Sequence, residues 1–177
     1  KNKMIVQKFK ERNIPVVLAD RSIPNLEIDH VTTDNLDGAY KLTTYLIGKG
    51  HSKIAFVFSN IVTTERLRFD GYRKALTDHG IQFDPSIVVS HPGPFSDEQF
   101  SKYAQTVLKQ RKKISAIFAA HDRIAYTFYS VAKSMGVSFP EDLSIVGYDD
   151  LPSPNIPLTT MHQPIYEMGE ESMKLIS

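Results

Sequence analysis

The sequence contains no cysteine and no tryptophan, and it has no long hydrophobic run. Without cysteine the chain has no disulfide, no thiolate metal ligand and no cysteine nucleophile, although this count leaves the compartment open because exported proteins also lack cysteine in many cases. No stretch approaches the roughly 18 consecutive apolar residues of a membrane span, and residues 1–12 are rich in lysine, unlike a signal peptide. We therefore expect neither a membrane span nor a retained signal peptide.

An excess of charge of one sign is also absent, because 21 Lys and Arg residues stand against 20 Asp and Glu residues, for a formal net charge of +1. A stand-alone nucleic-acid-binding module needs a broad basic field, so any DNA-binding part is expected outside this chain. The 177 residues, of which 41% are apolar, are typical of one globular domain, or of one domain with part of another. The missing initiator Met and an end inside an amphipathic pattern indicate a fragment of a longer protein.

Short apolar runs alternate with helical patterns along most of the chain. Asp34 and either Thr63 or Thr64 are the expected N-caps of two of the helices. Strands that are apolar throughout and separated by helices indicate a parallel sheet covered on both faces, which is the doubly wound α/β arrangement. The expected strands are 14–19, 29–33, 54–58, 87–89, 114–119, 143–148 and 158–161, and the expected helices begin near 34, 63, 97, 122 and 163.

Five side chains suited to ligand binding come after expected strands, at the sheet edge where doubly wound folds bind ligands. Carboxylates accept from vicinal hydroxyls, a guanidinium donates through a planar fork, and an aromatic ring covers the C–H face of a sugar. The set therefore predicts a site for a polyhydroxylated ligand. It comprises Asp20, Arg68, Phe95, His121 and Asp149.

Each member of this set also has a purely structural interpretation. Aspartate is also common as a turn or N-cap residue. This interpretation applies most strongly to Asp122, because it directly precedes an expected helix. Arg68 by itself is typical of an exposed helical residue paired with a neighbour such as Glu65, and Phe95 is typical of a loop aromatic that covers the core. Their joint placement after several strands favours the binding site.

Motifs for catalysis and metal binding are missing. The six histidines are scattered, with no HExxH pair, and there is no GxSxG elbow. His121 and Asp122 beside Asp149 would be an acid–base pair, but no nucleophile or oxyanion donor accompanies them. We therefore predict no enzymatic activity, no cofactor and no metal.

A series of short motifs runs through nearly the whole chain in a fixed order and spacing. They are Ile14-Pro15-Val16-Val17 with Asp20-Arg21, Thr33-Asp34-Asn35, Gly50-His51-Ser52-Lys53-Ile54-Ala55, Arg68-Phe69-Asp70-Gly71-Tyr72, Leu143-Ser144-Ile145-Val146-Gly147-Tyr148-Asp149-Asp150, and Leu158-Thr159-Thr160 with Gln163-Pro164. Together they resemble the effector-binding domain of the lac-repressor/gal-repressor (LacI/GalR) family of transcription regulators, which shares its fold with periplasmic sugar-binding proteins.

The resemblance implies a periplasmic-binding-protein fold of type I, in which two α/β subdomains are hinged by three crossing strands and the ligand lies in the cleft between them. Residues 1–33 are expected to be part of the N-subdomain and 34–160 most of the C-subdomain, whereas 161–177 form a crossover and a helix that return to the N-subdomain. The resemblance also implies a DNA-binding head that is not in this chain, a homodimer and a cytoplasmic location.

Position by position, the resemblance assigns roles to the candidate residues. Arg68 resembles the family arginine that holds ligand hydroxyls or a carboxylate, and Asp149 resembles the aspartate opposite it. Asp20 matches an aspartate on the N-subdomain side of the cleft, and Phe95 matches the aromatic residue that covers the ligand. Thr64 matches a polar contact of some members.

Two positions depart from the family pattern. His121 stands where sugar-responsive members commonly have asparagine, which keeps hydrogen bonding but alters its geometry. Val62 stands where the purine-responsive member has a second arginine, so a purine corepressor is not expected. Both departures bear on the identity of the ligand.

The leading hypothesis is the ligand-sensing domain of a bacterial transcription regulator, in which a small sugar or sugar derivative controls operator binding. The alternative is an exported sugar-binding protein that feeds a transporter. Arg68→Ala and Asp149→Ala are each expected to abolish the ligand response without unfolding the protein. Residues 1–177 alone are expected to associate through exposed apolar faces, whereas 34–160 carry the better-formed core.

Overall fold

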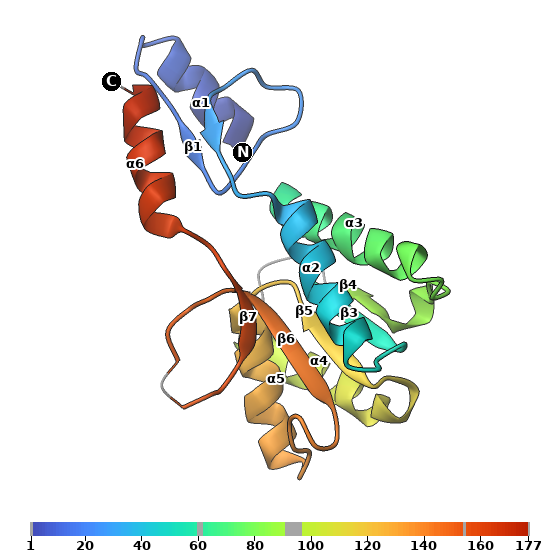
Figure 1. Cartoon of the computed structure of the whole chain (residues 1–177). Helices are drawn as coiled ribbons and strands as arrows, with labels where there is room; N and C mark the ends of the chain where they lie inside the picture. The colour runs from blue at the N-terminus through green and yellow to red at the C-terminus, as the bar shows by residue number, and fades with distance from the viewer. Residues whose placement is uncertain (1, 60–61, 91–96, 154, 177) are drawn as a thin grey trace.

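The computed structural model describes residues 2–59, 62–90, 97–153 and 155–176. Figure 1 shows a large lobe with a sheet flanked by helices, and a smaller lobe that contains α1 and α6. Two segments connect the lobes, one leading into α2 and one leading out of β7. The helices are α1 (Asn2–Lys10), α2 (Asn35–Gly48), α3 (Thr63–Asp78), α4 (Asp97–Lys109), α5 (Asp122–Ser134) and α6 (Ile165–Ile176), with 3-10 turns η1 (Pro85–Ile87) and η2 (Arg111–Lys113).

The large lobe is built on a five-stranded sheet in the order β4-β3-β5-β6-β7. Every neighbouring pair is parallel, so the carboxyl ends of all the strands lie at one edge. The predicted α/β class with a parallel, doubly wound sheet is confirmed. The strands are β3 (Ile54–Phe58), β4 (Val88–Ser90), β5 (Ala116–Ala119), β6 (Ser144–Asp149) and β7 (Thr159–His162).

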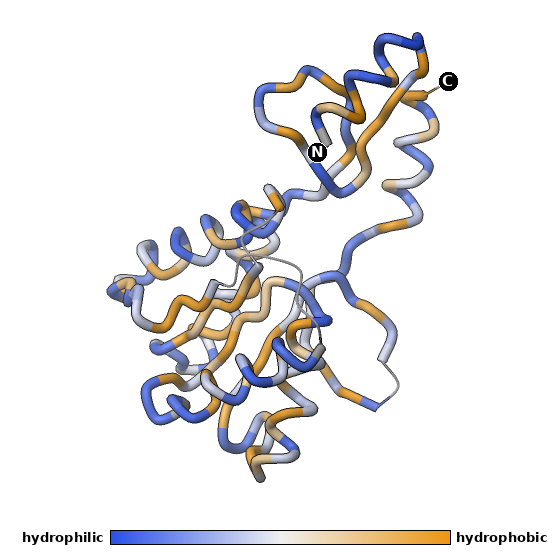
Figure 2. Tube along the Cα trace, turned by 180° about the vertical axis from the view of Figure 1, so that it is seen from behind, coloured by the Kyte–Doolittle hydropathy of each residue, from blue (hydrophilic) through white to orange (hydrophobic). Residues whose placement is uncertain are grey.

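Apolar side chains fill both faces of this sheet. On one face the ring of Phe56 lies 5.1 Å from that of Tyr72 in α3, measured between ring centres. Phe128 of α5 contacts Phe100 of α4 (ring centres 6.5 Å apart) in the other helix pair. Figure 2 shows hydrophobic residues in orange along the strands inside the large lobe. Among the described ranges, no helix combines the length and the apolar character needed to cross a membrane.

Helix α2 packs closely on α3 and on the sheet because two glycines leave room for it. A Cβ atom at Gly71 would lie 2.2 Å from the backbone oxygen of Leu36, and one at Gly38 would lie 2.2 Å from the hydroxyl of Tyr148. Both distances are far shorter than any real Cβ contact. This close approach brings the first turn of α2 to the carboxyl edge of the sheet.

The N-cap predictions have different outcomes. The Asp34 carboxylate accepts a hydrogen bond from the backbone N–H of Asp37 (2.9 Å), so its predicted capping of α2 is confirmed. The prediction for Thr63 or Thr64 is wrong, because α3 begins at Thr63 after Val62, with no side-chain cap bond. The Thr63 hydroxyl instead donates to the backbone oxygen of Ser22 (3.1 Å), a residue of the loop after β1.

The small lobe holds a two-stranded parallel sheet of β1 (Leu18–Ala19) and β2 (His30–Val31), with α1 and α6 beside it. The predicted strand 14–19 is therefore mostly not strand, because only its last two residues pair with β2. Apolar side chains on this lobe stay exposed, and Tyr166 and Met173 of α6 are 78% and 64% exposed. The predicted association of the 177-residue chain depends on such faces and stays a prediction.

Candidate functional site

Arg68 lies at the carboxyl edge of the large sheet, and its guanidinium is fixed on several sides. Its Nε donates to Oδ1 of Asn35 (2.8 Å), and its Nη1 donates to the backbone oxygen of Ala120 (2.6 Å). Its Cζ lies 3.7 Å from the centre of the Tyr148 ring, a cation–π contact. The residue is only 3% exposed, so the alternative of an exposed helical arginine paired with Glu65 is wrong.

Asp149 ends β6 opposite this arginine. Its Oδ1 lies 3.2 Å from Nη1 of Arg68 and accepts a hydrogen bond from Nε2 of Gln163 (2.8 Å). Burial raises the pKa of the Asp149 carboxyl, and the Arg68 charge and the Gln163 hydrogen bond oppose that rise. Its backbone φ is 118°, which costs a non-glycine residue on the order of 1 to 3 kcal/mol. Backbone strain of this kind gathers at functional sites.

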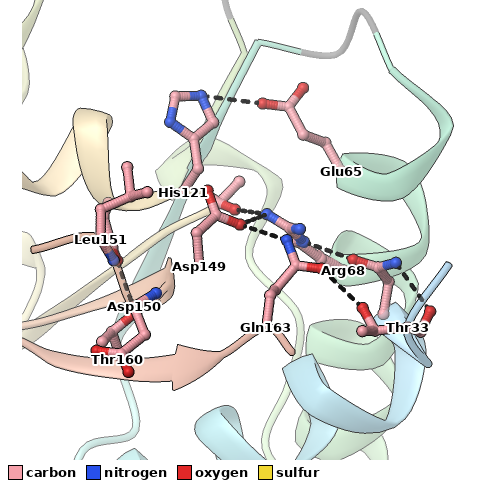
Figure 3. Close-up of polar contacts among 12 residues, drawn as sticks. Thr33, Glu65, Arg68, His121, Asp149, Asp150, Leu151, Thr160 and Gln163 are labelled. Atoms are coloured by element: carbon pink, nitrogen blue, oxygen red, sulfur yellow. Dashed lines mark hydrogen bonds and ion pairs between the residues drawn. The ribbon is translucent and has the colours of Figure 1, made fainter. Parts of the chain in front are cut away.

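Gln163 joins Asp149 to both segments that connect the lobes. It follows β7 in one connection, and its Oε1 accepts from the hydroxyl of Thr33 in the other (2.9 Å). Figure 3 shows Thr33, Gln163, Asp149 and Arg68 in one continuous polar chain. Sequence reasoning missed Gln163 and Asn35 as site residues. Both occur in the motifs that carried the family resemblance, and that occurrence was the available signal.

A second buried carboxylate, Glu65, lies next to His121 at the same edge. Its Oε1 accepts from the backbone N–H of Ser59 (3.2 Å) and its Oε2 from the Ser59 hydroxyl (2.5 Å). Nε2 of His121 lies 3.5 Å from Oε1, and Figure 3 shows the two side chains facing each other. Burial lowers the pKa of His121, Glu65 raises it by a smaller amount, and Arg68 and Arg123 lower it further. His121 is therefore neutral at neutral pH.

Replacing His121 with asparagine is expected to reduce the loss of stability on acidification. Because the pKa of His121 is lower in the folded protein than in the unfolded chain, only the unfolded chain takes up this proton as the pH falls just below about 6.5. This residue therefore lowers the free energy of unfolding by up to about 1.4 kcal/mol per pH unit in that window. Urea unfolding at pH 7 and at pH 5 measures the effect. An unchanged pH dependence in H121N, or an equal change in the exposed-site control His30→Asn, would contradict it.

Asp122 has a structural role that sequence reasoning assigned differently. It lies inside α5, and His121 occupies the cap position without a side-chain bond, so the N-cap interpretation of Asp122 is wrong. Its carboxylate accepts from the backbone N–H of Leu151 (2.8 Å) and from the hydroxyl of Thr160 (2.7 Å). Burial raises the pKa of this carboxyl, and those two hydrogen bonds lower it. Asp122 thereby fastens the loop after β6 to β7.

The other predicted site residues lie around this network. Thr64 is buried in the first turn of α3. Asp20 is exposed on the small lobe just after β1, with φ of 51°, and its charge contributes to the raised pKa of Asp149. Phe95 lies outside the described residues. The structure therefore brings Arg68, His121 and Asp149 together at one edge, with Asp20 on the lobe across from it.

Metal binding finds no support in the part of the chain that the structure describes. Across those residues, no three His, Asp or Glu side chains gather in a way that would hold an ion. The polar groups instead form hydrogen bonds and ion pairs with one another.

Comparisons with known proteins agree with this geometry. The profile of the periplasmic binding protein-like domain matches residues 43–177. The HTH-type transcriptional repressor CytR of Escherichia coli is 36% identical over 172 residues, which cover 94% of this chain and 50% of CytR. The transcription regulator CcpA of Lactococcus lactis superposes with a TM-score of 0.86 at 30% identity, over 98% of this chain and 64% of that one. A LacI-family regulator from Enterococcus faecium with bound ribose gives a TM-score of 0.83 at 29% identity, over 99% of this chain and 66% of that one.

The two lobes and the polar edge between them define a ligand-binding domain of the periplasmic-binding-protein class. Within that class, the chain belongs to the LacI/GalR family of effector-binding domains, which confirms the resemblance seen in the sequence. The chain spans about half the length of the curated relatives that it matches. The prediction that the chain is not an enzyme is confirmed by its family membership, because its relatives in that family are transcriptional repressors and regulators.

Proposed function

We propose that this chain senses a small sugar or sugar derivative for a bacterial transcription regulator and thereby controls operator binding. The observation that carries the proposal is the polar chain from Arg68 through Asp149 and Gln163 to Thr33. It connects the groups best suited to hold hydroxyls with the two segments that join the lobes. A ligand at Asp149 is therefore in contact with the elements that set the orientation of the lobes.

The mechanism follows from the hydrogen-bonding capacity of these groups. Asp149 accepts hydrogen bonds from ligand hydroxyls, and the neighbouring Arg68 and His121 bind the other polar atoms of the ligand. Asp20 adds a carboxylate from the small lobe, so a ligand that bonds to both sides favours one relative orientation of the lobes. In a regulator that couples this orientation to its DNA-binding heads, ligand binding changes the affinity for operator DNA. Operator binding then changes the affinity for the ligand by the same coupling free energy.

The proposal includes partners that lie outside this chain. Operator DNA is bound through a head that is not part of the sequence, and two copies form a homodimer in the cytoplasm. Residues 1–33 and 161–177 are proposed to belong to the N-subdomain, and 34–160 to the C-subdomain. Phe95 is proposed to cover the ligand and Thr64 to contact it. No cofactor or metal takes part.

The alternative of an exported sugar-binding protein is not favoured. The relatives that match are DNA-binding transcriptional repressors and regulators. Sequencing the gene upstream of Lys1 separates the two functions, because a helix-turn-helix region supports the regulator and a secretion signal supports the alternative.

A thermal-shift experiment on the complete protein tests the proposal. Ribose is bound in the relative from Enterococcus faecium, so a panel of sugars, sugar acids and phosphosugars begins with ribose. A true ligand present at about 100 times its Kd stabilises the folded protein by about 2.7 kcal/mol and raises the Tm. Asp149→Asn, which removes the charge and keeps the shape, is expected to lose most of this shift. Failure of every compound to raise the Tm, or an equal shift in D149N, would contradict the proposed site.

A further inference from the structure

The charges at the carboxyl edge of the sheet restrict which ligands bind there. Glu65 is the unexpected member, because this glutamate is only 2% exposed and both of its oxygens accept hydrogen bonds from Ser59. It lies one turn before Arg68 on α3 and faces His121. The proposed ligand site includes Arg68 and His121 but assigns no role to Glu65.

The positive amino ends of two helices at this edge already have acidic side chains beside them. α3 and α5 begin after β3 and β5, and the positive end of a helix dipole normally attracts phosphate or carboxylate groups. α3 carries the buried Glu65 in its first turn, and α5 carries the buried Asp122. A carboxylate in the first turn satisfies the same positive end that a ligand anion would need.

The side-chain cations at this edge are also engaged or screened. Arg68 is bonded to Asn35, Ala120 and Asp149. His121 is neutral at neutral pH because burial lowers its pKa. Arg21, next to Asp20 on the small lobe, and Arg123, in the first turn of α5, are both exposed, so water and salt screen their charges.

We propose that Glu65 is a specificity-determining residue that makes the site select uncharged polyhydroxylated ligands over phosphorylated or acidic ones. The inference rests on the proposed ligand-sensing function. Arg68 is the one buried cation at this edge in the part of the chain that the structure describes, and against it stand the carboxylates of Glu65 and Asp149, with Asp20 across from them on the small lobe. A ligand phosphate would enter this negative field with no unpaired buried cation, among the described residues, to receive it.

Matched pairs of a neutral sugar and its phosphate ester test the inference on the complete protein, beginning with ribose and ribose 5-phosphate. Calorimetry gives the Kd of each member at pH 7.5. The neutral sugar is expected to bind at least about tenfold more tightly than its phosphate ester. Glu65→Gln removes the charge and retains an acceptor for Ser59. It is expected to reduce the ratio of the two Kd values, phosphate ester over neutral sugar, by about tenfold. The control Glu141→Gln, at an exposed glutamate of the same lobe, leaves the ratio unchanged.

The outcomes separate this inference from the function on which it rests. Equal or tighter binding of the phosphate ester by the unaltered protein overturns the inference and leaves the sensing function standing. An unchanged ratio in a folded E65Q variant overturns the role of Glu65, because a merely structural glutamate would change stability without changing charge selectivity. If E65Q does not fold, the ratio for the unaltered protein still decides whether anions are excluded. Absence of binding across all pairs contradicts the proposed function and the inference together.

Discussion

Replacing Arg68 with alanine is expected to lower the free energy of unfolding by about 3 kcal/mol or more and to abolish ligand binding. The substitution leaves Asp149 without its positive partner and leaves the acceptors on Asn35 and Ala120 without their donor. It also removes the guanidinium from the Tyr148 ring. The expectation from the sequence was loss of ligand response with the fold intact, and the structure adds a loss of stability because it buries Arg68 almost completely.

Urea unfolding and calorimetry on the same preparation measure the two effects. Arg68→Lys keeps the charge but loses the planar fork, and it is expected to recover part of the stability and little of the binding. Arg12→Ala, at an exposed arginine of the small lobe, is the control and is expected to change stability by no more than about 0.5 kcal/mol. Stability of R68A within that same range would contradict the role of Arg68 in holding the edge together.

Replacing Asp122 with alanine is expected to lower the free energy of unfolding by about 2 kcal/mol and to weaken ligand binding. Two donors, the backbone N–H of Leu151 and the hydroxyl of Thr160, lose their acceptor. The loop after β6 then loses its attachment to α5, and that loop directly follows Asp149. Binding falls because the position of the Asp149 carboxylate depends on this attachment.

A neighbouring aspartate provides the matched control. Asp150 pairs with His162 (3.0 Å), but both side chains are largely exposed, and such surface pairs contribute about 0 to 1 kcal/mol. Asp150→Asn removes the charge of this pair and suits the left-handed backbone at this position (φ of 57°), so it is expected to be close to the unaltered protein in chemical denaturation. If D150N and D122A lost equal stability, the buried contacts of Asp122 would not be what fastens the loop.

The two variants probe the same network from opposite ends. Arg68 reaches it from α3, and Asp122 reaches it from α5 through the loop beside Asp149. Gln163 continues the network into the connection between the lobes. Loss of either end should therefore disturb ligand binding as well as stability.

The sequence by itself determined the class of fold and the edge at which the candidate site residues lie. Runs such as 54–58 and 116–119 are apolar at every position, and a strand covered on both faces buries such a run completely. Parallel strands end at one edge, so Arg68, His121 and Asp149 had to meet there once the alternation of strands and helices was recognised. Local capping by Asp34 was also readable, because its partner is three residues away.

Tertiary structure decided what each of these side chains contacts. Thr63 bonds to Ser22 instead of capping its helix, and Asp122 bonds to Leu151 and Thr160 instead of capping α5. A local rule cannot choose between a neighbour in sequence and an acceptor or donor that folding brings from another element.

The burial of the charged side chains Glu65 and Arg68 also depends on tertiary packing. Helical spacing places Glu65 and Arg68 on the same face of α3 as Tyr72, but charged side chains are typical of the surface, and only the packed structure shows that both are almost fully buried at the edge of the sheet. Gln163 joins Thr33 across 130 positions of the chain, so its role depends on how the two connections run side by side. The charge balance that sets ligand specificity therefore belongs to the packed structure, because it is the sum of groups from separate helices and strands.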